Sequence, residues 1–574
     1  MEWAGDFLLT FGSQRSVHKA RFGSPWILKQ EISGGKLFYS ASSGQWKGSP
    51  SISWKDHGKE YWLLGTVWGI KEDLHPSDWA GHFILIGHES DKQVWHIWTD
   101  RCGTFHAYYA MNGSNAAVGS YFPSVAKAVS KREFDWEGIA SFFTFGYFLQ
   151  DRTYYRDVKI IKPSTHIMLN ESGKIIYHSQ DWNWKYQPNL SRTFDDSVDE
   201  FAQIFHSVMA EQTSGKNIAF PLSGGLDSRS TIAALSPENQ AAMNMWSYSY
   251  GYSNDSIETN IAYQIAHARG LDFKKFTIEP YLFNRLPQIL ESVEGYQDIT
   301  QSRQAAVIDE IGSHADFLVA AHLGDLWFDD MGLANSPKPL REDDIKSYAI
   351  KKFTKNGRWL VENICFNVYP KTRIIDSMRQ SVDEEFMLLN GISEPDFRLK
   401  ALKVNQWVFR WTLASIRMFQ PGAFPILPYF DPRIVDFFCT VPSKFVIGRK
   451  MQVEYLKRYA PDLARINWQV YNANLYNYQY HNSWNLPMRA YNKFTRFLKG
   501  QPVIQRNWEL QFLGESGRNG VIENLLRPGL MLHDFVSPIK IKELIDGFYA
   551  HPTSKDGYVV SMLLTFSARI ESFT

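Results

Sequence analysis

The chain has few cysteines, no excess of charge and no long apolar run. Its three cysteines, Cys102, Cys365 and Cys439, lie far apart, and this spacing suits neither a metal site nor a disulfide framework, which favours a reducing compartment. The 61 basic and 60 acidic residues balance, so no overall field predicts binding to nucleic acid or to an anionic membrane. The run IASFFTFGYFL is too short to span a bilayer, and MEWAGDFLLTFG lacks the basic start of a signal peptide. These absences predict a soluble, cytoplasmic protein.

The composition is that of an ordered protein with more than one domain. Hydrophobic residues make up 44% of the 574 residues and aromatics 15%, which argues against long disordered tracts. Residues 1–185 read as short apolar or alternating runs broken by turn residues, which predicts antiparallel β layers with one helix near 136–143. The polar stretch 183–193 is the expected boundary, and residues 190–574 form the expected second domain.

Beyond this boundary the pattern changes to alternating strands and helices. The stretch RTFDDSVDEFAQIFHSVMAEQ is amphipathic, and apolar strands follow at NIAFPL, MWSYSY, FKKFTI and DFLVAAHLGD, with helical segments between them. This alternation predicts a doubly wound parallel sheet. From about residue 340 the pattern is mainly helical, interrupted by the proline-rich QPGAFPILPYFDP.

The stretch FPLSGGLDSRS places a glycine loop between a strand and a helix. Gly224 and Gly225 allow a ligand to approach the backbone, and hydroxyls at Ser223 and Ser228 add donors near the helix N-terminus. This is the chemistry of an anion site, and we expect the anion to be phosphate. Asp227 would repel phosphate unless a divalent cation lies between them, so the loop predicts a phosphate chain bound with Mg²⁺.

A second acidic glycine loop, AAHLGDLWFDD, ends a later predicted strand with Asp325. Carboxylates at two strand ends of one parallel sheet can face the same cation. The alternative is that SGG forms an ordinary turn, and the paired acidic loops weigh against it. The common phosphate loop does not apply, because LDS stands where its Gly-Lys-Ser/Thr ending would be.

The sequence LSGGLDS with a downstream GD loop resembles the pyrophosphatase-type loop (PP-loop) of the glutamine-hydrolysing asparagine synthetase family. The turn formed by Asp100, Arg101 and Gly103 ahead of Tyr108 and Tyr109 resembles the core of that family's glutaminase domain. The stretch LPYFDPRIVDFFCTVPSKFVIGRKMQVEYLKRYAPDL resembles its synthetase segment. The resemblance runs in family order over about residues 70–465.

This resemblance implies a fold and a reaction. The fold would be an N-terminal antiparallel β-sandwich of the glutaminase-like, Ntn type, followed by an α/β parallel-sheet PP-loop ATP pyrophosphatase domain with a helical C-terminal part. A carboxylate would attack the α-phosphate of ATP, and an amine would then displace AMP to form an amide. The residues implied to bind ATP or pyrophosphate are Leu222, Ser223, Gly224, Gly225, Asp227, Ser228, Trp246, Ser247 and Gly324.

Mg²⁺ would be held by Asp227 and Asp325, and the cation of Lys450 would neutralise charge on the leaving group. A lysine on a helix is otherwise usually solvated, so Lys450 depends on its place in the resembling segment. Adenine would lie near residues 246–248. The resemblance also implies a homodimer.

The chain departs from the family pattern at three places. Glu2 stands where active members carry a nucleophilic cysteine, so the first domain is expected to lack glutaminase activity. His322 replaces an acid and is a candidate general base toward the amine; the alternative is a histidine bonded to a loop carbonyl. Asn467 and Trp468 lie where the family usually supplies another lysine.

The expected function is therefore an ATP- and Mg²⁺-dependent ligase that joins a small-molecule or peptide carboxylate to an amine or ammonia. In lacking the nucleophile it is similar to β-lactam synthetases and lasso-peptide cyclases. One alternative is a true glutamine-hydrolysing asparagine synthetase with a misassigned start. The other is a degenerate ATP-binding scaffold protein.

Overall fold

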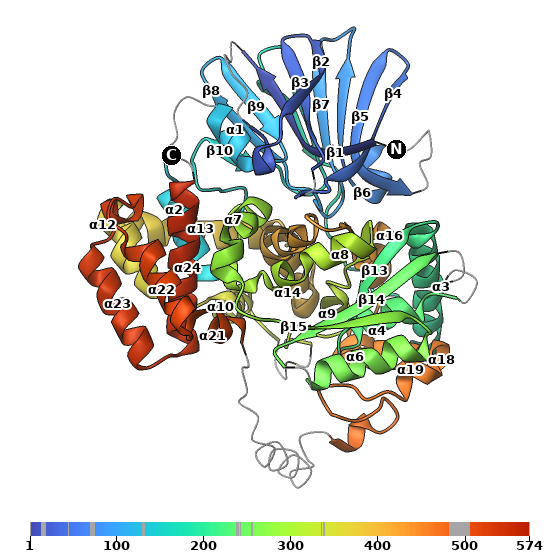
Figure 1. The fold of residues 1–574 in the computed structure, drawn as a ribbon. Helices are drawn as coiled ribbons and strands as arrows, with labels where there is room; N and C mark the ends of the chain where they lie inside the picture. Colours follow the sequence, from blue (N-terminus) through green and yellow to red (C-terminus); the bar gives the residue numbers. More distant parts are fainter. Residues whose placement is uncertain are drawn as a thin grey trace.

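The structure, a computed structural model, contains two β-sheets with helices packed around them. It describes residues 2–12, 19–43, 45–68, 75–128, 133–236, 240, 243–253, 256–334, 336, 339–481 and 506–572. One sheet forms the upper part of the molecule in Figure 1, and the second sheet and most helices form the lower part. None of the described helices has the length and apolar character needed to cross a membrane.

The N-terminal sheet has twelve strands and is antiparallel throughout. Its main order is β10-β8-β9-β1-β4-β5-β6-β7-β11-β12, and β3 pairs with both β1 and β2. The strands are β1 (Glu2–Phe11), β2 (Trp26–Ile32), β3 (Gly35–Ala41), β4 (Ser49–Asp56), β5 (Lys59–Trp68), β6 (Ala80–Glu89), β7 (Val94–Thr99), β8 (Tyr108–Asn112), β9 (Asn115–Gly119), β10 (Val158–Ile160), β11 (Thr165–Leu169) and β12 (Ile175–Gln180).

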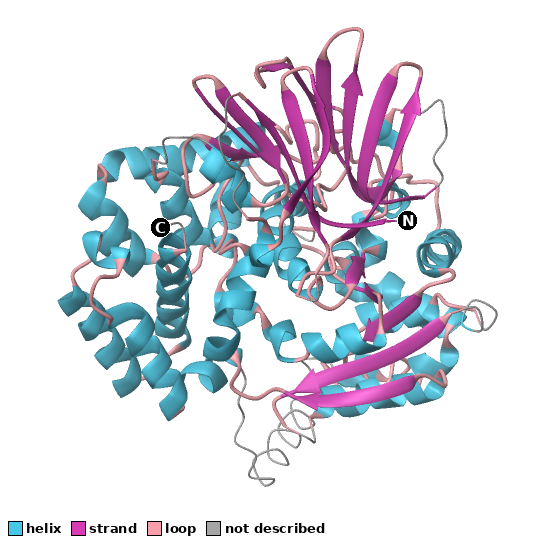
Figure 2. Ribbon diagram, turned by 45° about the horizontal axis from the view of Figure 1, so that its top comes forward, coloured by secondary structure: helices cyan, strands magenta, loops and turns pink. Residues whose placement is uncertain are grey.

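The sheet curves into a half-barrel, and side chains along its strands alternate between the two faces. Phe7 and Leu9 of β1 enter one core together with Ile84 and Ile97, whereas Leu8 points to the opposite face and joins the core beneath. Hydrogen bonds connect all twelve strands, so the expected β layers are present as one continuous sheet rather than two separate sheets. Figure 2 shows this sheet as a fan of strands above the helices.

The second sheet has five parallel strands in the order β15-β14-β13-β16-β17. The four strands expected from the sequence are present, and a fifth, β17, forms within the proline-rich stretch that was expected only to interrupt helices. From β13 the chain adds strands on one side and then returns to the other side at β16. The strands are β13 (Asn217–Pro221), β14 (Asn244–Gly251), β15 (Asp272–Thr277), β16 (Phe317–Val319) and β17 (Phe424–Ile426).

Two helices lie between strands of the N-terminal region, where one was expected. They are α1 (Phe122–Ala128) and α2 (Trp136–Phe145). The α2 helix packs against the C-terminal helix α24 (Ser554–Glu571), with the rings of Phe143 and Phe566 5.3 Å apart. The expected boundary at 183–193 is followed by α3 (Phe194–Thr213), which Thr193 caps.

The remaining helices surround the parallel sheet and form the C-terminal layer (Figure 1). They are α4 (Asp227–Ala233), α6 (Ile257–Ala268), α7 (Leu282–Val293), α8 (Ile308–His314), α9 (Gly324–Trp327), α10 (Glu342–Phe353), α11 (Arg358–Leu360), α12 (Phe366–Val368), α13 (Lys371–Met387), α14 (Pro395–Lys403), α15 (Leu413–Ile416), α16 (Pro432–Phe438), α17 (Ser443–Val446), α18 (Lys450–Tyr459), α19 (Pro461–Ala464), α21 (Asn507–Phe512), α22 (Glu515–Leu526) and α23 (Pro538–Ala550).

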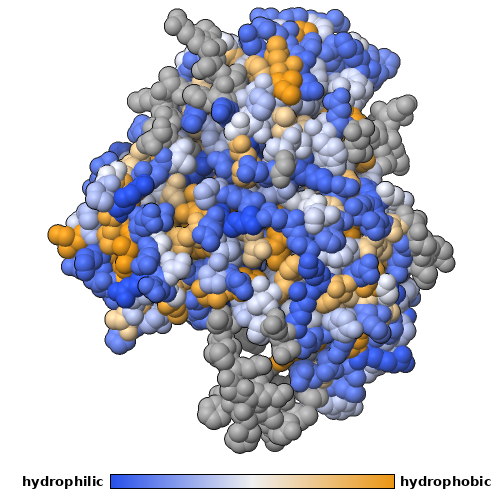
Figure 3. All heavy atoms as spheres, in the orientation of Figure 1, coloured by the Kyte–Doolittle hydropathy of each residue, from blue (hydrophilic) through white to orange (hydrophobic). Residues whose placement is uncertain are grey.

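A buried charge network joins the two regions. Glu294, which follows α7, is 0% exposed and accepts hydrogen bonds from Arg21 at 3.0 Å, Arg417 at 2.6 Å and Tyr108 at 2.9 Å. Burial alone would raise the pKa of Glu294, but Arg417 and Arg21 lower it to about 2. The network therefore fixes the N-terminal sheet onto the helices below. The face of the molecule shown in Figure 3 is mainly hydrophilic, with apolar residues in small groups.

Candidate functional site

The two acidic glycine loops lie side by side. They follow β13 and β16, which are hydrogen-bonded neighbours, and lead into α4 and α9. The contact is close, because a Cβ on Gly324 would lie 2.6 Å from Oδ1 of Asp227. This edge is where the strand order reverses, the position at which parallel sheets bind ligands. The structure thus brings together the two loops that the sequence singled out.

Hydroxyls organise the first loop. Ser228 Oγ accepts the backbone N–H of Ser223 at 3.2 Å, and Ser223 Oγ accepts the N–H of Gly225 at the same distance. The two glycines have different surroundings. A Cβ on Gly224 would lie 2.7 Å from the side chain of Gln469, whereas one on Gly225 would meet only Ser223 Oγ at 3.3 Å. Gly224 therefore allows a close chain contact, and Gly225 keeps its side of the loop open.

Asp227 begins α4, and its carboxylate faces one cation, one amide and another acid. Its Oδ1 accepts hydrogen bonds from Arg449 and from Gln452, each at 3.0 Å. Burial raises the pKa of Asp227 to about 6; Arg449 opposes this shift and Asp325 adds to it. A carboxylate near a second acid, with its charged form disfavoured, has the electrostatics expected of a cation ligand. The expected binding of Mg²⁺ by Asp227 and Asp325 remains a prediction.

A cavity of about 380 Å³ opens beside these loops. Five of the predicted site residues line this cavity, all from the two loop regions: Ser223, Asp227, Ser228, His322 and Asp325. Further along the chain the wall includes Lys403, Trp407, Trp411, Thr412 and Phe419. The volume is at the small end of the range for ligand sites.

His322 lies in this wall with its Nδ1 buried and without a hydrogen-bond partner among the described residues. Burial lowers the pKa of His322 to about 4, partly opposed by Asp325. The ring is therefore neutral at pH 7, as expected, but it is a weaker base than an ordinary histidine. Nδ1 does not form the hydrogen bond to a loop carbonyl that the alternative interpretation of His322 requires.

The sequence reasoning missed a wall of the cavity. Residues 404–412 form a π-helix, a wide helical turn that is frequent at functional sites, and the rings of Trp407 and Trp411 stack 4.9 Å apart. Lys403 precedes them, with its ammonium 4.7 Å from the centre of the Trp407 ring. Burial lowers the pKa of Lys403, partly opposed by Asp325. The signal available in the sequence was the spacing of KVNQWVFRW, one basic residue ahead of two tryptophans.

The cation that contacts Asp227 is Arg449 rather than its neighbour. Arg449 has a left-handed backbone, with φ of 58°, which turns the chain just before α18 and directs the guanidinium to Asp227. Lys450 is exposed and is not among the residues that line the cavity. Its expected role at the leaving group remains a prediction.

The residues expected near adenine lie outside this cavity wall. Ser247 is buried and donates to the carbonyl oxygen of Asp272 at 2.7 Å. The Trp246 ring stacks on His314 at 4.6 Å. Leu222 is buried and its N–H donates to the carbonyl oxygen of Tyr248 at 2.8 Å. The strand β14 continues to Gly251, so its cavity-lining residue is Tyr250.

Arg229, near the end of the SGGLDSRS stretch, has a structural role. It is fully buried and donates to three backbone carbonyls, those of Leu463 at 3.2 Å, Ile466 at 2.9 Å and Asn467 at 2.8 Å. These bonds anchor the segment that follows α19 to the back of the glycine loop. Asn467 and Trp468 stand where the family resemblance implies a lysine. This anchor and an isolated β-bridge between Trp468 and Ala473 hold them in place.

A second cavity of about 400 Å³ adjoins the first, and Gln301 and Arg303 line both. Three basic residues, Arg303, Lys355 and Arg506, line it, with Asp298 as the acid. Asp298 is buried, and its Oδ1 accepts the N–H of Thr300 at 2.9 Å. Burial raises the pKa of Asp298, which disfavours its charge. The second cavity therefore has a net positive lining.

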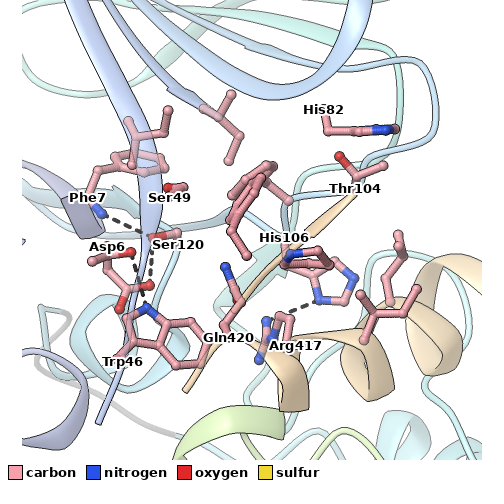
Figure 4. Close-up of a pocket in the computed structure, with 18 of the residues that line it drawn as sticks. Asp6, Phe7, Trp46, Ser49, His82, Thr104, His106, Ser120, Arg417 and Gln420 are labelled. Atoms are coloured by element: carbon pink, nitrogen blue, oxygen red, sulfur yellow. Dashed lines mark hydrogen bonds between the residues drawn. The ribbon is translucent and has the colours of Figure 1, made fainter. Parts of the chain in front are cut away.

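The N-terminal sheet has a much smaller cavity, of about 40 Å³, beneath β1 (Figure 4). At one end, Ser120 donates to Asp6 at 2.9 Å and accepts the N–H of Phe7 at 3.0 Å. At the other end, Arg417 lies 3.3 Å from Nδ1 of His106. No cysteine is among the described residues that line it. All three cysteines are buried and free, and burial raises the pKa of each thiol.

Comparison with known proteins adds no identification. No protein-family model matches the chain, and a search of curated proteins finds no match. The class of protein that the fold defines is therefore coarse: an antiparallel half-barrel joined to a parallel α/β sheet with helices.

Proposed function

We propose that the protein is an ATP- and Mg²⁺-dependent ligase that adenylates a carboxylate and converts it into an amide. The observation that carries this proposal is the contact between the two acidic glycine loops at the strand-order reversal, where Gly324 leaves room for the carboxylate of Asp227. In this proposal the parallel sheet is a PP-loop pyrophosphatase domain, and the half-barrel is a glutaminase-like domain of Ntn type.

The proposed reaction has two steps, adenylation and amide formation. A carboxylate oxygen bonds to the α-phosphorus of ATP as the bond to the β-phosphate oxygen breaks, which releases pyrophosphate. The nitrogen of an amine or ammonia then bonds to the acyl carbon, AMP leaves and the nitrogen loses a proton. Mg²⁺ on Asp227 and Asp325 would offset the charge of the pyrophosphate.

The chain's own residues would perform three tasks. The Ser223 and Ser228 hydroxyls and the open backbone at Gly225 would bind phosphate oxygens. Arg449 and Lys403 would stabilise the charge that develops on the leaving group. His322 would accept a hydrogen bond from the incoming amine, and its low pKa means that it would serve as base only if the bound ligands raise that pKa.

The basic second cavity favours an acidic acyl substrate. It shares Arg303 with the cavity at the loops, so a substrate whose carboxylate lies near Asp325 could place a second anionic group near Lys355 or Arg506. We propose that the carboxylate substrate carries such a group. We also propose that the nitrogen does not come from glutamine hydrolysis, because the buried thiols with raised pKa values are poor nucleophiles.

The decisive experiment is ATP–pyrophosphate exchange across a panel of mono- and dicarboxylates, with Mg²⁺ present. One or more carboxylates should support exchange, and Asp227→Ala should reduce it by at least about 10²-fold. Asp343→Ala, at an exposed acid on α10, is the matched control and should exchange at the wild-type rate. ATP binding without exchange for any carboxylate would favour the scaffold alternative and end the ligase proposal.

A further inference from the structure

Three side chains from separate segments of the N-terminal region lie close together. They are His75, which caps the short turn before β6; His166, on β11; and Asp181, immediately after β12. One ligand atom from each lies within 4.8 Å of the other two. No other group of three such ligands is found in the described part of the chain. The cluster belongs to none of the cavities described above.

Neighbouring groups hold two of these side chains in place. His96 on β7 puts its Nδ1 3.0 Å from Nε2 of His166, and the His166 ring stacks on Trp98 at 4.5 Å. Ser179 donates to Oδ1 of Asp181 at 2.6 Å, and the Asp181 N–H donates to the Ser164 carbonyl at 2.8 Å. Partners of this kind orient metal ligands in proteins.

The cluster also has an accessible side. His75 is 48% exposed, and its Nδ1 lies 3.7 Å from Oδ2 of Asp181. Ligand atoms around tetrahedral zinc are about 3.3–3.6 Å apart, given bonds of about 2.0–2.2 Å. The distance from His75 Nδ1 to Asp181 Oδ2 is close to this value, and His75 is the most exposed of the three side chains.

We propose that His75, His166 and Asp181 bind a Zn²⁺ ion, with the fourth position open to solvent. Two imidazoles and one carboxylate suit zinc, whereas Mg²⁺ prefers oxygen ligands throughout. The bound ion links the turn before β6 to the β11–β12 hairpin and so stabilises this edge of the half-barrel. This proposal does not depend on the ligase proposal, because no residue of the parallel sheet takes part.

The test is titration calorimetry of the chelator-treated full chain with Zn²⁺ alone. Wild type should bind one ion. Asp181→Asn and His166→Ala should each weaken binding by about 100-fold or more, and His96→Ala by about 10- to 100-fold, the usual effect of an outer partner. His178→Ala is the matched control, since His178 lies on the same hairpin but is exposed, and it should bind as wild type does.

Thermal unfolding with and without Zn²⁺ gives an independent measurement. Zn²⁺ should raise the unfolding temperature of wild type and of His178→Ala but not that of Asp181→Asn. If His166→Ala does not fold, Asp181→Asn decides the question, because it keeps the size of the side chain. The proposal is overturned if Asp181→Asn binds Zn²⁺ with wild-type affinity, or if Mg²⁺ binds at this cluster as tightly as Zn²⁺.

Discussion

The cavity beneath β1 and the cavity at the parallel sheet differ in how their charges are satisfied. Around the first, Asp6, Arg21, Glu294 and Arg417 pair with one another at 2.6–3.1 Å and leave only about 40 Å³ of space. At the parallel-sheet cavity, Arg449 pairs with Asp227, but burial and Asp325 still raise the pKa of Asp227. His322 has a buried nitrogen without a hydrogen-bond partner among the described residues. Charges that satisfy one another fully hold the structure together, whereas incompletely satisfied groups in an open cavity are typical of a ligand site.

The largest effect is expected from a substitution in the buried charge network around Glu294. Glu294→Ala leaves Arg21 and Arg417 buried without their shared carboxylate, so the free energy of unfolding should fall by about 3–5 kcal/mol. Because the folded pKa of Glu294 is lowered to about 2, the network's contribution is present above the unfolded pKa and is lost as the pH falls from about 4.5 to about 2.

Urea unfolding of wild type and Glu294→Ala at pH 7 and pH 3 measures this effect. Glu310→Ala, which removes a partly exposed glutamate of α8 that pairs with Lys274, is a control for loss of a glutamate. A fall of less than 1 kcal/mol for Glu294→Ala would mean that the network does not hold the two regions together.

The second prediction separates the two neighbouring cations. Arg449→Ala removes a guanidinium that contacts Asp227 at 3.0 Å and should reduce ATP–pyrophosphate exchange by about 10²-fold, the usual cost of losing one such donor. Lys450→Ala should reduce it by less than tenfold, because Lys450 is exposed and, unlike Arg449, is not the cation that pairs with Asp227. The reverse order of effects would restore Lys450 to the role that the family resemblance implies.

The third prediction concerns the carboxylate of Asp227, whose pKa stays raised although Arg449 pairs with it. The folded pKa of Asp227 is raised to about 6, so its charged form destabilises the unliganded protein above that pH. Asp227→Asn should therefore raise the free energy of unfolding by on the order of 1 kcal/mol at pH 8, and the gain should disappear as the pH falls toward 4. The same variant should lose exchange activity.

Chemical denaturation of unliganded Asp227→Asn and wild type from pH 4 to pH 8 tests the sign of this effect. A variant that is less stable than wild type at pH 8 would show that Asp227 is held as a structural ion pair with Arg449. The two cavities would then not differ in the way described.

The smallest expected effect is that of Cys102→Ala, which should leave glutamate release unchanged. If the half-barrel lacks glutaminase activity, glutamate release from glutamine should be at the buffer level in wild type and in Cys102→Ala, since the Cys102 thiol is buried with a raised pKa. An enzymatic glutamate assay measures this. Release that Cys102→Ala abolishes would make Cys102 a nucleophile, and release that survives it would place a glutaminase elsewhere in the chain.

Periodicity predicted most of the fold, because it depends on contacts near in sequence. The four strands from NIAFPL to DFLVA and the antiparallel character of residues 1–185 are confirmed. The short β17 was missed, because the middle one of its three residues is Pro425 and the strand pairs only with β16 among the described strands. The π-helix at 404–412 was also missed, since a wide turn has no distinct apolar period.

The sequence by itself determined where the acidic glycine loops lie and that they end strands of a parallel sheet, because chain order and glycine content are local properties. Only the tertiary structure decided which groups meet there. Gly324 lies against Asp227, Arg449 rather than Lys450 pairs with Asp227, and Arg229 anchors residues 463–467. These outcomes depend on the packing of segments more than 90 residues apart, where a one-residue difference in backbone direction decides which side chain reaches the site.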